Sequence, residues 1–352
     1  MPGPFPNPPP YLRGKVRCID HNAQSLRGNP WGDPTHRDLW VYTPPGYGAD
    51  DTKYPVIMIL PGFGGTGEGM LSRGLTDISL AHRIDHLISG ADENGNELDP
   101  CPPFIAVLPD VMSRLGGTQF LDSPGIGNYA SWLMHEVRPF IDGRFQTNGR
   151  WGATGRSSGG FGALSLAMRY PNAFSAIACH AGDMGFDLCY LADLPKALGP
   201  LRAAGGPMAF ITEFWKKRHF SSHEFAAMNL LCMAAAYDPN PAAKPGEYPA
   251  TLPLDLETGA VDFEAYQRWR AHDPLTRIDD PKAQASLQAL DLLFIDAGAH
   301  DEYHLQLGAR RFAKKLVQYG IEHTHEEFSG GHRGTSWRYD ISLPLMANAL
   351  TP

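Results

Sequence analysis

The chain has few cysteines, no long apolar run and no block of basic residues. Its five cysteines form no CxxC pair and have no zinc-ribbon spacing, so we expect reduced, buried thiols. One disulfide remains open if the protein is exported. No apolar run reaches the roughly 18 residues that a transmembrane helix needs. With 30 Lys+Arg against 38 Asp+Glu, the net charge of −8 argues against a nucleic acid or an anionic membrane as the main partner.

The first twelve residues, MPGPFPNPPPYL, lack the basic and apolar regions of a signal peptide. Their proline content predicts an extended arm of polyproline type. We therefore expect a cytoplasmic protein, or a secreted one if a leader has been removed. The 43% of hydrophobic residues are enough for a large core and exclude disorder as the global state.

Short apolar segments recur along the chain with spacers of helical length between them. They lie at residues 38–43, 55–60, 104–108, 149–154, 176–181 and 292–296. Several are continuous rather than alternating, which is typical of strands covered on both faces of a parallel sheet. Their alternation with helical patterns, such as the one at 305–316, predicts an α/β fold with a mainly parallel central sheet flanked by helices.

About 110 residues separate the strand ending near Ala181 from the strand starting near Leu292, far more than an ordinary crossover needs. The segment begins with an aromatic, helix-compatible part, continues through a proline-rich loop at 238–253 and ends with a predicted helix at 262–271. Because the chain then returns to the same sheet, we interpret the segment as an inserted cap. The predicted arm, core and cap comprise residues 1–28, 29–185 with 286–352, and 186–285, respectively.

The strongest local motif is the G-x-S-x-G of residues 155–159, between a strand-like and a helix-like segment. A sharp strand-to-helix turn brings the side chains two before and two after the serine into collision, and Gly155 and Gly159 remove that collision. The turn places Ser157 above the sheet at the positive end of a helix. Ser157 is therefore the predicted nucleophile.

A serine nucleophile needs a histidine and an acid. After a G-x-S-x-G turn, we expect these residues in the chain order Ser, acid, His. His332 lies between glycine pairs after the last predicted strand, at 323–328, and is the predicted general base. Asp301 is the predicted acid that orients it, with Asp296 and Glu302 as neighbouring alternatives. Both loops follow the carboxyl ends of strands, where open α/β sheets place their sites.

An oxyanion hole needs two backbone N–H groups aimed at one point. Ser158 should supply one, because it directly follows the nucleophile. The turn at 61–65 follows an early strand and should supply the other, from Phe63, with Gly64 as the alternative.

Two weaker motifs suggest other chemistry. Residues 62–67 match GxGxxG after a strand, but Asp85, near the position of the expected acid, lies in a helical pattern. His300 and His304 have the spacing of the HExxH zinc motif without its glutamate or a third ligand. We therefore predict no cofactor and no metal.

These motifs resemble the esterase D-like family of the α/β-hydrolases, which includes S-formylglutathione hydrolases, feruloyl and acetylxylan esterases, and mycolyltransferases. The likeness covers most of the chain and is most specific in GRSSGGFGAL (155–164), DAGAHDEYHL (296–305) and EEFSGGH (326–332). The family's D-x-G-x-x-D pattern favours Asp301 as the acid. The chain departs from the family at Pro61-Gly62, where members carry His-Gly, and in its longer, proline-rich cap.

Motifs and resemblance together predict a serine carboxylic-ester hydrolase that acts on small acyl or aryl esters, feruloyl-type or other aromatic esters among them, through an acyl-enzyme. An acyltransferase with the same triad is the alternative, and a non-catalytic binding protein on this fold is a further one. Gly64 and the cap aromatics Phe186 and Tyr190 are expected to line the substrate pocket. The expected partner is a small-molecule ester, and a homo-oligomer remains open.

Overall fold

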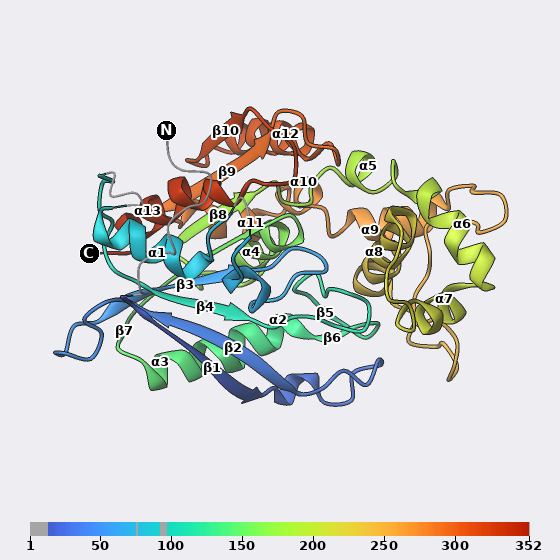
Figure 1. The fold of residues 1–352 in the computed structure, drawn as a ribbon. Helices are drawn as coiled ribbons and strands as arrows, with labels where there is room; N and C mark the ends of the chain where they lie inside the picture. Colours follow the sequence, from blue (N-terminus) through green and yellow to red (C-terminus); the bar gives the residue numbers. More distant parts are fainter. Residues whose placement is uncertain (1–12, 75–76, 92–96, 352) are drawn as a thin grey trace, which may run out of the picture.

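An eight-stranded sheet forms the centre of the molecule, which the computed structural model describes at residues 13–74, 77–91 and 97–351 (Figure 1). The strands lie in the order β1-β2-β4-β3-β7-β8-β9-β10. Their bounds are β1 (Lys15–Asn22), β2 (His36–Thr43), β3 (Tyr54–Leu60), β4 (Ile105–Pro109), β7 (Thr147–Arg156), β8 (Ala176–His180), β9 (Leu292–Gly298) and β10 (Thr324–Phe328). A separate ribbon pairs β5 (Asp122–Ser123) with β6 (Gly127–Asn128).

The strands from β4 to β10 in sheet order pair in parallel, whereas β1 and β2 are antiparallel to their neighbours. All seven residues of β3 are buried, which explains why its sequence is continuously apolar. The register aligns Leu60 with Gly155, Arg156 with His180, and His180 with Asp296, so several strands end at one edge. The predicted α/β fold with a mainly parallel sheet is confirmed.

The structure places β1 inside residues 1–28, the predicted N-terminal arm. β1 is an edge strand that pairs with β2 from Lys15↔Thr43 to Asn22↔His36. Most of its residues are exposed or half-buried. An edge strand with exposed, charged side chains has little apolar pattern, so it could not be recognised from the sequence. The expected polyproline arm at residues 1–12 lies outside the described residues.

Helices cover both faces of the sheet. On one face, α1 (Leu80–Ser89) and α13 (Tyr339–Leu350) pack against the alternate residues Ile57 and Ile59 of β3. On the other face lie α4 (Ser158–Arg169), α12 (Leu305–Gln318) and the continuous helical stretch of α2 (Tyr129–Ser131), the π-helical turn at Trp132–Val137 and α3 (Arg138–Arg144). The predicted apolar face of α12, Leu305, Ala309, Phe312 and Leu316, is buried.

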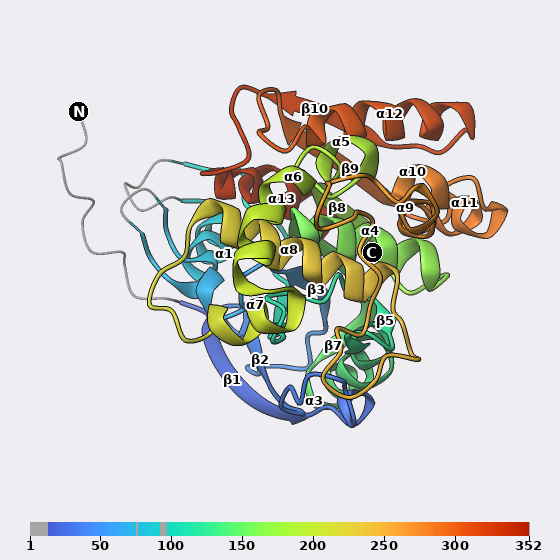
Figure 2. The same ribbon diagram turned by 90° about the vertical axis from the view of Figure 1, so that its right-hand side faces the viewer.

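The long segment between β8 and β9 is mainly helical, and much of it lies beside the sheet at one end of the molecule (Figures 1 and 2). Its helices are α5 (Phe186–Cys189), α6 (Leu194–Ala204), α7 (Pro207–Phe214), α8 (Ser222–Tyr237), α9 (Phe263–Arg270), α10 (Pro274–Arg277) and α11 (Pro281–Gln288). Helix α8 begins with a complete capping box between Ser221 and Glu224. Its second half is buried between α6 and the core, where the Ser123 hydroxyl donates to the Ala235 carbonyl.

The last helices of the segment return to the core. Helices α10 and α11 pack on α4, so α11 has the position of the usual crossover helix before β9. Helix α9 begins after Asp262, whose side chain accepts hydrogen bonds from the N–H groups of Glu264 and Ala265. This helix confirms the one predicted at 262–271.

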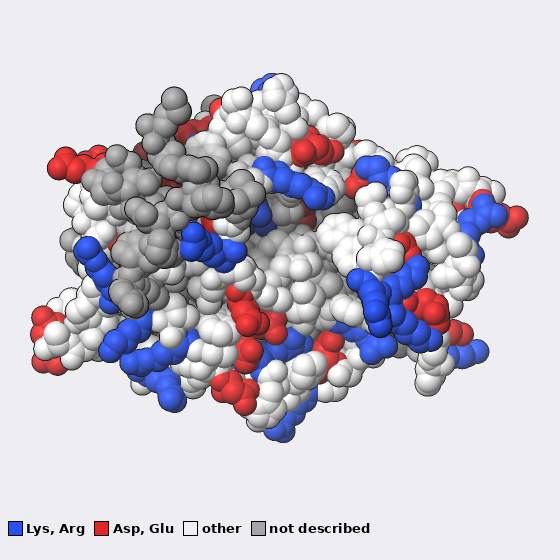
Figure 3. Space-filling view, in the orientation of Figure 1, with Lys and Arg blue, Asp and Glu red and all other residues white. Residues whose placement is uncertain are grey.

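The distribution of charged side chains on the surface agrees with the absence of a basic block from the sequence. Basic and acidic side chains are interspersed on the face shown in Figure 3, around a largely uncharged centre. Within the described residues no helix is long and apolar enough to cross a bilayer. All five cysteines are free and only Cys18 is exposed, as expected for reduced thiols.

Candidate active site

Ser157 occupies a sharp turn between β7 and α4. Its φ of 59° and ψ of −128° are strained for a residue with a side chain. A Cβ on Gly155 would lie 2.5 Å from the carbonyl carbon of Gly159, and one on Gly159 would lie 2.1 Å from the carbonyl oxygen of Leu60. The two glycines therefore allow β7, α4 and β3 to meet closely enough to form this turn.

Backbone hydrogen bonds hold the turn in place. The Ser157 N–H donates to the His180 carbonyl at 2.9 Å, and the Ser157 carbonyl accepts from the Phe161 N–H at 3.0 Å. Ser157 therefore sits at the N-terminus of a twelve-residue helix, where the unpaired N–H groups favour negative charge.

His332 and Asp301 are hydrogen-bonded to each other. The distance from His332 Nδ1 to Asp301 Oδ2 is 2.8 Å, and the aspartate side chain is fully buried. The other oxygen of Asp301 accepts the N–H of Tyr303 at 2.8 Å, and the Tyr303 ring packs edge-on against His332 with centroids 4.8 Å apart. Because these contacts hold Nδ1, the Nε2 atom of His332 is left to accept a proton from another group.

Glu302, one of the alternative acids, contacts the backbone of His332 rather than its ring. It accepts the His332 N–H at 2.7 Å, and this bond lowers the pKa of its carboxyl group. The loops of Asp301 and His332 lie side by side because β9 and β10 are parallel neighbours. The N–H of His300 donates to the carbonyl of Gly330 at 2.9 Å across this contact.

Asp296, the other alternative acid, belongs to a buried network of its own. His180 connects Asp296 Oδ1 and Ser342 Oγ, each at 2.8 Å, and Arg338 donates to Asp296 Oδ2 at 2.6 Å. This Ser-His-Asp arrangement is closed to solvent, since Ser342 is 0% exposed. It ties α13 to the sheet, and it has no space for a substrate.

The N–H groups of Phe63, Gly64 and Gly65 in the turn after β3 differ in whether they already have a hydrogen-bond acceptor. The N–H of Gly64 donates to the Gly116 carbonyl at 2.8 Å and that of Gly65 to the Gly62 carbonyl at 2.9 Å. The N–H groups of Phe63 and Ser158 donate to none of the described residues. Of the two residues considered for this turn, Phe63 therefore has the available donor and Gly64 does not.

A cavity of about 680 Å³ opens between the core and the long helical segment. Ser157, Ser158, His332 and Phe63 line it together, so the structure brings these predicted residues to one space. Its other lining residues include Asp183, Asp193, Lys196, Phe220, Phe225, Tyr303 and Arg333.

The three residues expected to bind substrate have different positions. Tyr190 lines the cavity. Phe186 does not line it and is fully buried against Phe161 and Tyr237. Gly64 is also outside the lining, close to the Phe225 ring.

Asp183 is the residue of the cavity that sequence reasoning missed. It follows β8 at the carboxyl edge of the sheet, the same position that singled out Asp301 after β9. No motif marks it, and only this position could have suggested it.

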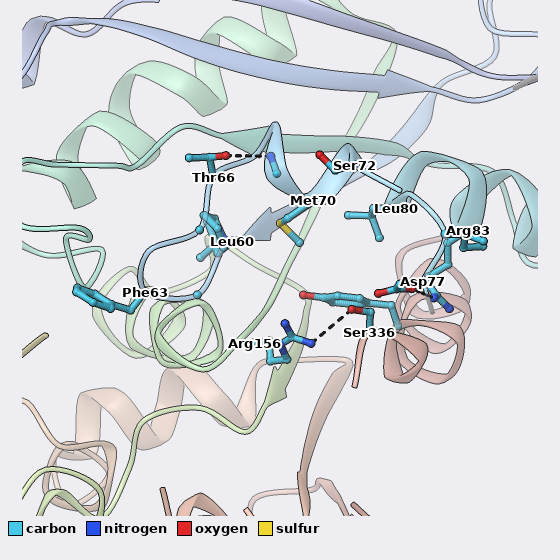
Figure 4. A pocket seen from close by; sticks show the side chains of 16 residues that line it. Leu60, Phe63, Thr66, Met70, Ser72, Asp77, Leu80, Arg83, Arg156 and Ser336 are labelled. Carbon is cyan, nitrogen blue, oxygen red and sulfur yellow. Dashed lines mark hydrogen bonds and ion pairs between the residues drawn. The ribbon is translucent and has the colours of Figure 1, made fainter. Parts of the chain in front are cut away.

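A second cavity, of about 370 Å³, lies on the other side of the turn after β3 (Figure 4). It shares Gly62, Phe63 and Arg156 with the first cavity. The Arg156 guanidinium donates to the hydroxyls of Thr335 at 3.2 Å and Ser336 at 3.4 Å, so a cation stands between the two spaces.

The weaker motifs have other structural roles. After the GxGxxG residues the described part of the chain makes a 3₁₀ turn at Gly69–Leu71, and the next helix, α1, begins at Leu80, so the glycines do not open directly into the helix that the fingerprint requires. Asp85 is buried and accepts the Tyr42 hydroxyl at 2.5 Å. Among the described residues, no group of three His, Cys, Asp or Glu side chains is arranged to hold a metal ion.

Comparison with known proteins identifies the family of the chain and solved structures that it is similar to. Residues 34–345 match the model of the Esterase family, described as "Putative esterase". A ferulic acid esterase structure has 17% identity and a TM-score of 0.60, over 96% of this chain and 99% of that one. An S-formylglutathione hydrolase from Agrobacterium tumefaciens has 15% identity and a TM-score of 0.55, over 97% and 98%. A ferulic acid esterase from Anaeromyces mucronatus has 16% and 0.57, over 100% and 97%. Curated protein sequences gave no match.

The parallel sheet, the strained serine turn and the loops at the carboxyl edge define the α/β-hydrolase fold. The chain belongs to the Esterase family and is a carboxylic ester hydrolase.

Proposed function

We propose that the protein hydrolyses small acyl or aryl esters with Ser157, His332 and Asp301 as its catalytic triad. One observation carries the assignment. A serine in a strained turn at a helix N-terminus shares a cavity with a histidine whose Nδ1 is fixed by a buried aspartate at 2.8 Å. The second Ser-His-Asp arrangement, at Ser342, is fully buried and has no such cavity.

In the first half of the reaction, Ser157 Oγ attacks the ester carbonyl carbon while His332 Nε2 takes the hydroxyl proton. Asp301 keeps the proton of the imidazole on Nδ1 and stabilises the imidazolium that forms. The tetrahedral intermediate collapses as His332 donates its proton to the leaving alcohol. The acyl group then remains on Ser157.

In the second half, His332 removes a proton from a water molecule, which attacks the acyl-enzyme carbonyl. Collapse of the second intermediate returns the proton to Ser157 and releases the acid. The N–H groups of Phe63 and Ser158 stabilise the oxyanion in both halves, and each such donor contributes about a hundred- to a thousandfold in kcat. Helix α4 adds the positive end of its dipole at the same point.

The aromatic lining of the cavity favours a substrate whose acyl group is of modest size and apolar or aromatic. Phe63 and Phe225 meet edge-to-face with centroids 5.2 Å apart, and Phe220 is stacked on Phe225 at 6.2 Å. All three rings line the cavity. The ferulic acid esterases among the similar structures support an aryl ester as one substrate.

The two Ser-His-Asp arrangements give a matched test. Ser157→Ala should reduce hydrolysis of p-nitrophenyl acetate and butyrate by at least about a thousandfold, because the nucleophile is lost. Ser342→Ala, at the closed arrangement, should keep ester hydrolysis within about tenfold of the wild type. A fluorophosphonate probe with peptide mapping should label Ser157. Label on another residue, or undiminished hydrolysis by Ser157→Ala, would overturn the assignment.

A further inference from the structure

Asp183 is a buried carboxyl group of the cavity to which the mechanism gives no role. Asp183 lines the cavity and is 6% exposed. Its Oδ2 accepts three hydrogen bonds, from Gln119 Nε2 at 3.0 Å, Ser158 Oγ at 3.0 Å and the Tyr190 hydroxyl at 2.9 Å. Its Oδ1 accepts none from the described residues and is reached from the cavity.

The three donors that hold Asp183 are neutral. Burial raises the pKa of its carboxyl group, while the three hydrogen bonds and, after them, the nearby His332 lower it. A buried carboxylate is costly without a paired cation. The other carboxylate of the lining, Asp193, has such a partner, since Lys196 Nζ lies 2.6 Å from its Oδ1. Asp183 therefore keeps an open oxygen and has no ion-pair partner within 4 Å among the described residues.

The position of Asp183 is fixed from several sides. Gln119 is fully buried, and it and Phe120 have the positive φ values of 51° and 54°. Such backbone costs energy and persists where the surroundings enforce it, commonly at functional sites. Gln119 also donates to the Tyr237 hydroxyl at 2.8 Å, so its amide nitrogen is committed to this cluster. The cluster thus holds the carboxylate with one oxygen toward the cavity.

The carboxylate lies beside the proposed oxyanion hole, since it accepts the Ser158 hydroxyl. Ser158, whose side chain it holds, directly follows the nucleophile and supplies an oxyanion donor. The cations Arg156 and Arg333 line the same cavity near the His332 loop, where Arg156 contacts Thr335. A cationic group of a substrate is therefore favoured at Asp183 and disfavoured beside these arginines.

We propose that Asp183 is a specificity-determining residue that binds a protonated amine on the acyl group, so that aminoacyl esters are the preferred substrates. An ammonium group gives Oδ1 a charge-assisted hydrogen bond and compensates the buried charge, which a neutral hydroxyl does only in part. The inference rests on the proposed ester hydrolysis at Ser157.

The experiment compares p-nitrophenyl esters of straight-chain ω-aminoacyl groups of about three to six carbons with alkanoyl and ω-hydroxyacyl esters of equal length. Each kcat/KM is corrected for spontaneous hydrolysis. For the wild type, the best aminoacyl ester should exceed its alkanoyl match by about 10- to 100-fold, which is the range of a charge-assisted hydrogen bond. The hydroxyacyl ester should lie between the two.

Asp183→Asn should reduce the aminoacyl-to-alkanoyl ratio to about one or less, whereas Asp193→Asn should retain it. The ratio is read within each variant, so a general loss of activity does not affect it. If Asp183→Asn does not fold, the wild-type ratio alone still decides, together with inhibition by alkylammonium ions against alcohols of equal length.

The outcomes separate the two proposals. Alkanoyl hydrolysis that depends on Ser157, without preference for any aminoacyl ester, overturns the inference and leaves the proposed function intact. A preference for the hydroxyacyl ester, or a high ratio that persists in folded Asp183→Asn, also overturns it. Absence of ester hydrolysis and of fluorophosphonate labelling overturns the proposed function and the inference with it.

Discussion

At the scale of single residues, three carboxyl groups near His332 have separate tasks. Asp301 binds the ring, Glu302 binds the backbone N–H, and Asp296 joins Arg338 and His180. Only Asp301 can fix the tautomer of His332, because only its oxygen meets Nδ1. The three therefore differ in what their removal should change.

Asp301→Asn should lower kcat for p-nitrophenyl butyrate by about a thousand- to ten-thousandfold, because the amide can present N–H to Nδ1 and favour the wrong tautomer. Glu302→Gln is the matched control, since its amide oxygen can still accept the His332 N–H. We expect it to change kcat by less than about tenfold. Equal losses in both variants would contradict the assignment of Asp301.

The nucleophile, base and acid could be predicted because each was marked by its position in the sequence as well as by its residue type. Ser157 had a glycine motif, and His332 and Asp301 followed strands whose carboxyl ends share one edge. The cap aromatic Phe186 shows the limit of this reasoning. Composition does not reveal which aromatic side chains fill a core, and Phe186 is fully buried in one.

At the scale of elements, the serine turn depends on close approach between β3, β7 and α4. The Leu60 carbonyl faces Gly159 where a side chain would overlap it. Overlap with a backbone atom is not relieved by a rotamer change, so α4 must shift if Gly159 is replaced. The nucleophile begins that helix and would shift with it.

Gly159→Ala should destabilise the protein by about 3 kcal/mol or more and abolish esterase activity, because of this overlap. Gly143→Ala is the control in helix α3, where a Cβ would meet nothing within 4 Å. It should be neutral or stabilise the protein by up to about 1 kcal/mol through helix propensity. Urea unfolding and hydrolysis of p-nitrophenyl butyrate measure both effects. Full activity of Gly159→Ala would contradict the packing described for this turn.

The strands of the parallel sheet were predictable because burial on both faces leaves continuous apolar runs, as in β3. Edge strand β1 was not, since a strand with one partner and exposed side chains carries no such run. In the long segment before β9, the sequence predicted helices and an irregular loop. How those helices pack on the core depends on contacts distant in sequence, such as Ser123 with Ala235.

At the scale of the whole molecule, His272 lies where the long helical segment meets the core. Arg169 of α4 donates to its Nδ1 at 3.3 Å, and its ring lies 5.2 Å from that of Tyr237 in α8. Burial, followed by the charges of Arg169 and Arg277, lowers the pKa of His272 from 6.5 to about 4. The folded protein therefore holds this histidine neutral.

Below pH 6.5 the unfolded chain binds a proton at His272 that the folded chain rejects until about pH 4, so stability falls as the pH decreases through this window. Between pH 7 and pH 5 this histidine should contribute a loss of about 2 kcal/mol. His272→Gln, whose carbonyl can accept from Arg169, should remove that part of the loss. Urea unfolding of both proteins at the two pH values provides the comparison. An unchanged pH dependence in the variant would contradict it.

The pairing of β8 with β9 also bears on how the chain folds. The two strands are neighbours, yet the segment between them has about 110 residues, where an ordinary crossover has about 15, and closing so long a loop costs roughly 2 kcal/mol more in chain entropy. Helices that form within the segment shorten the loop before the strands meet. We therefore expect the segment to fold before or together with this half of the sheet, and the β8–β9 contact to be among the last to form.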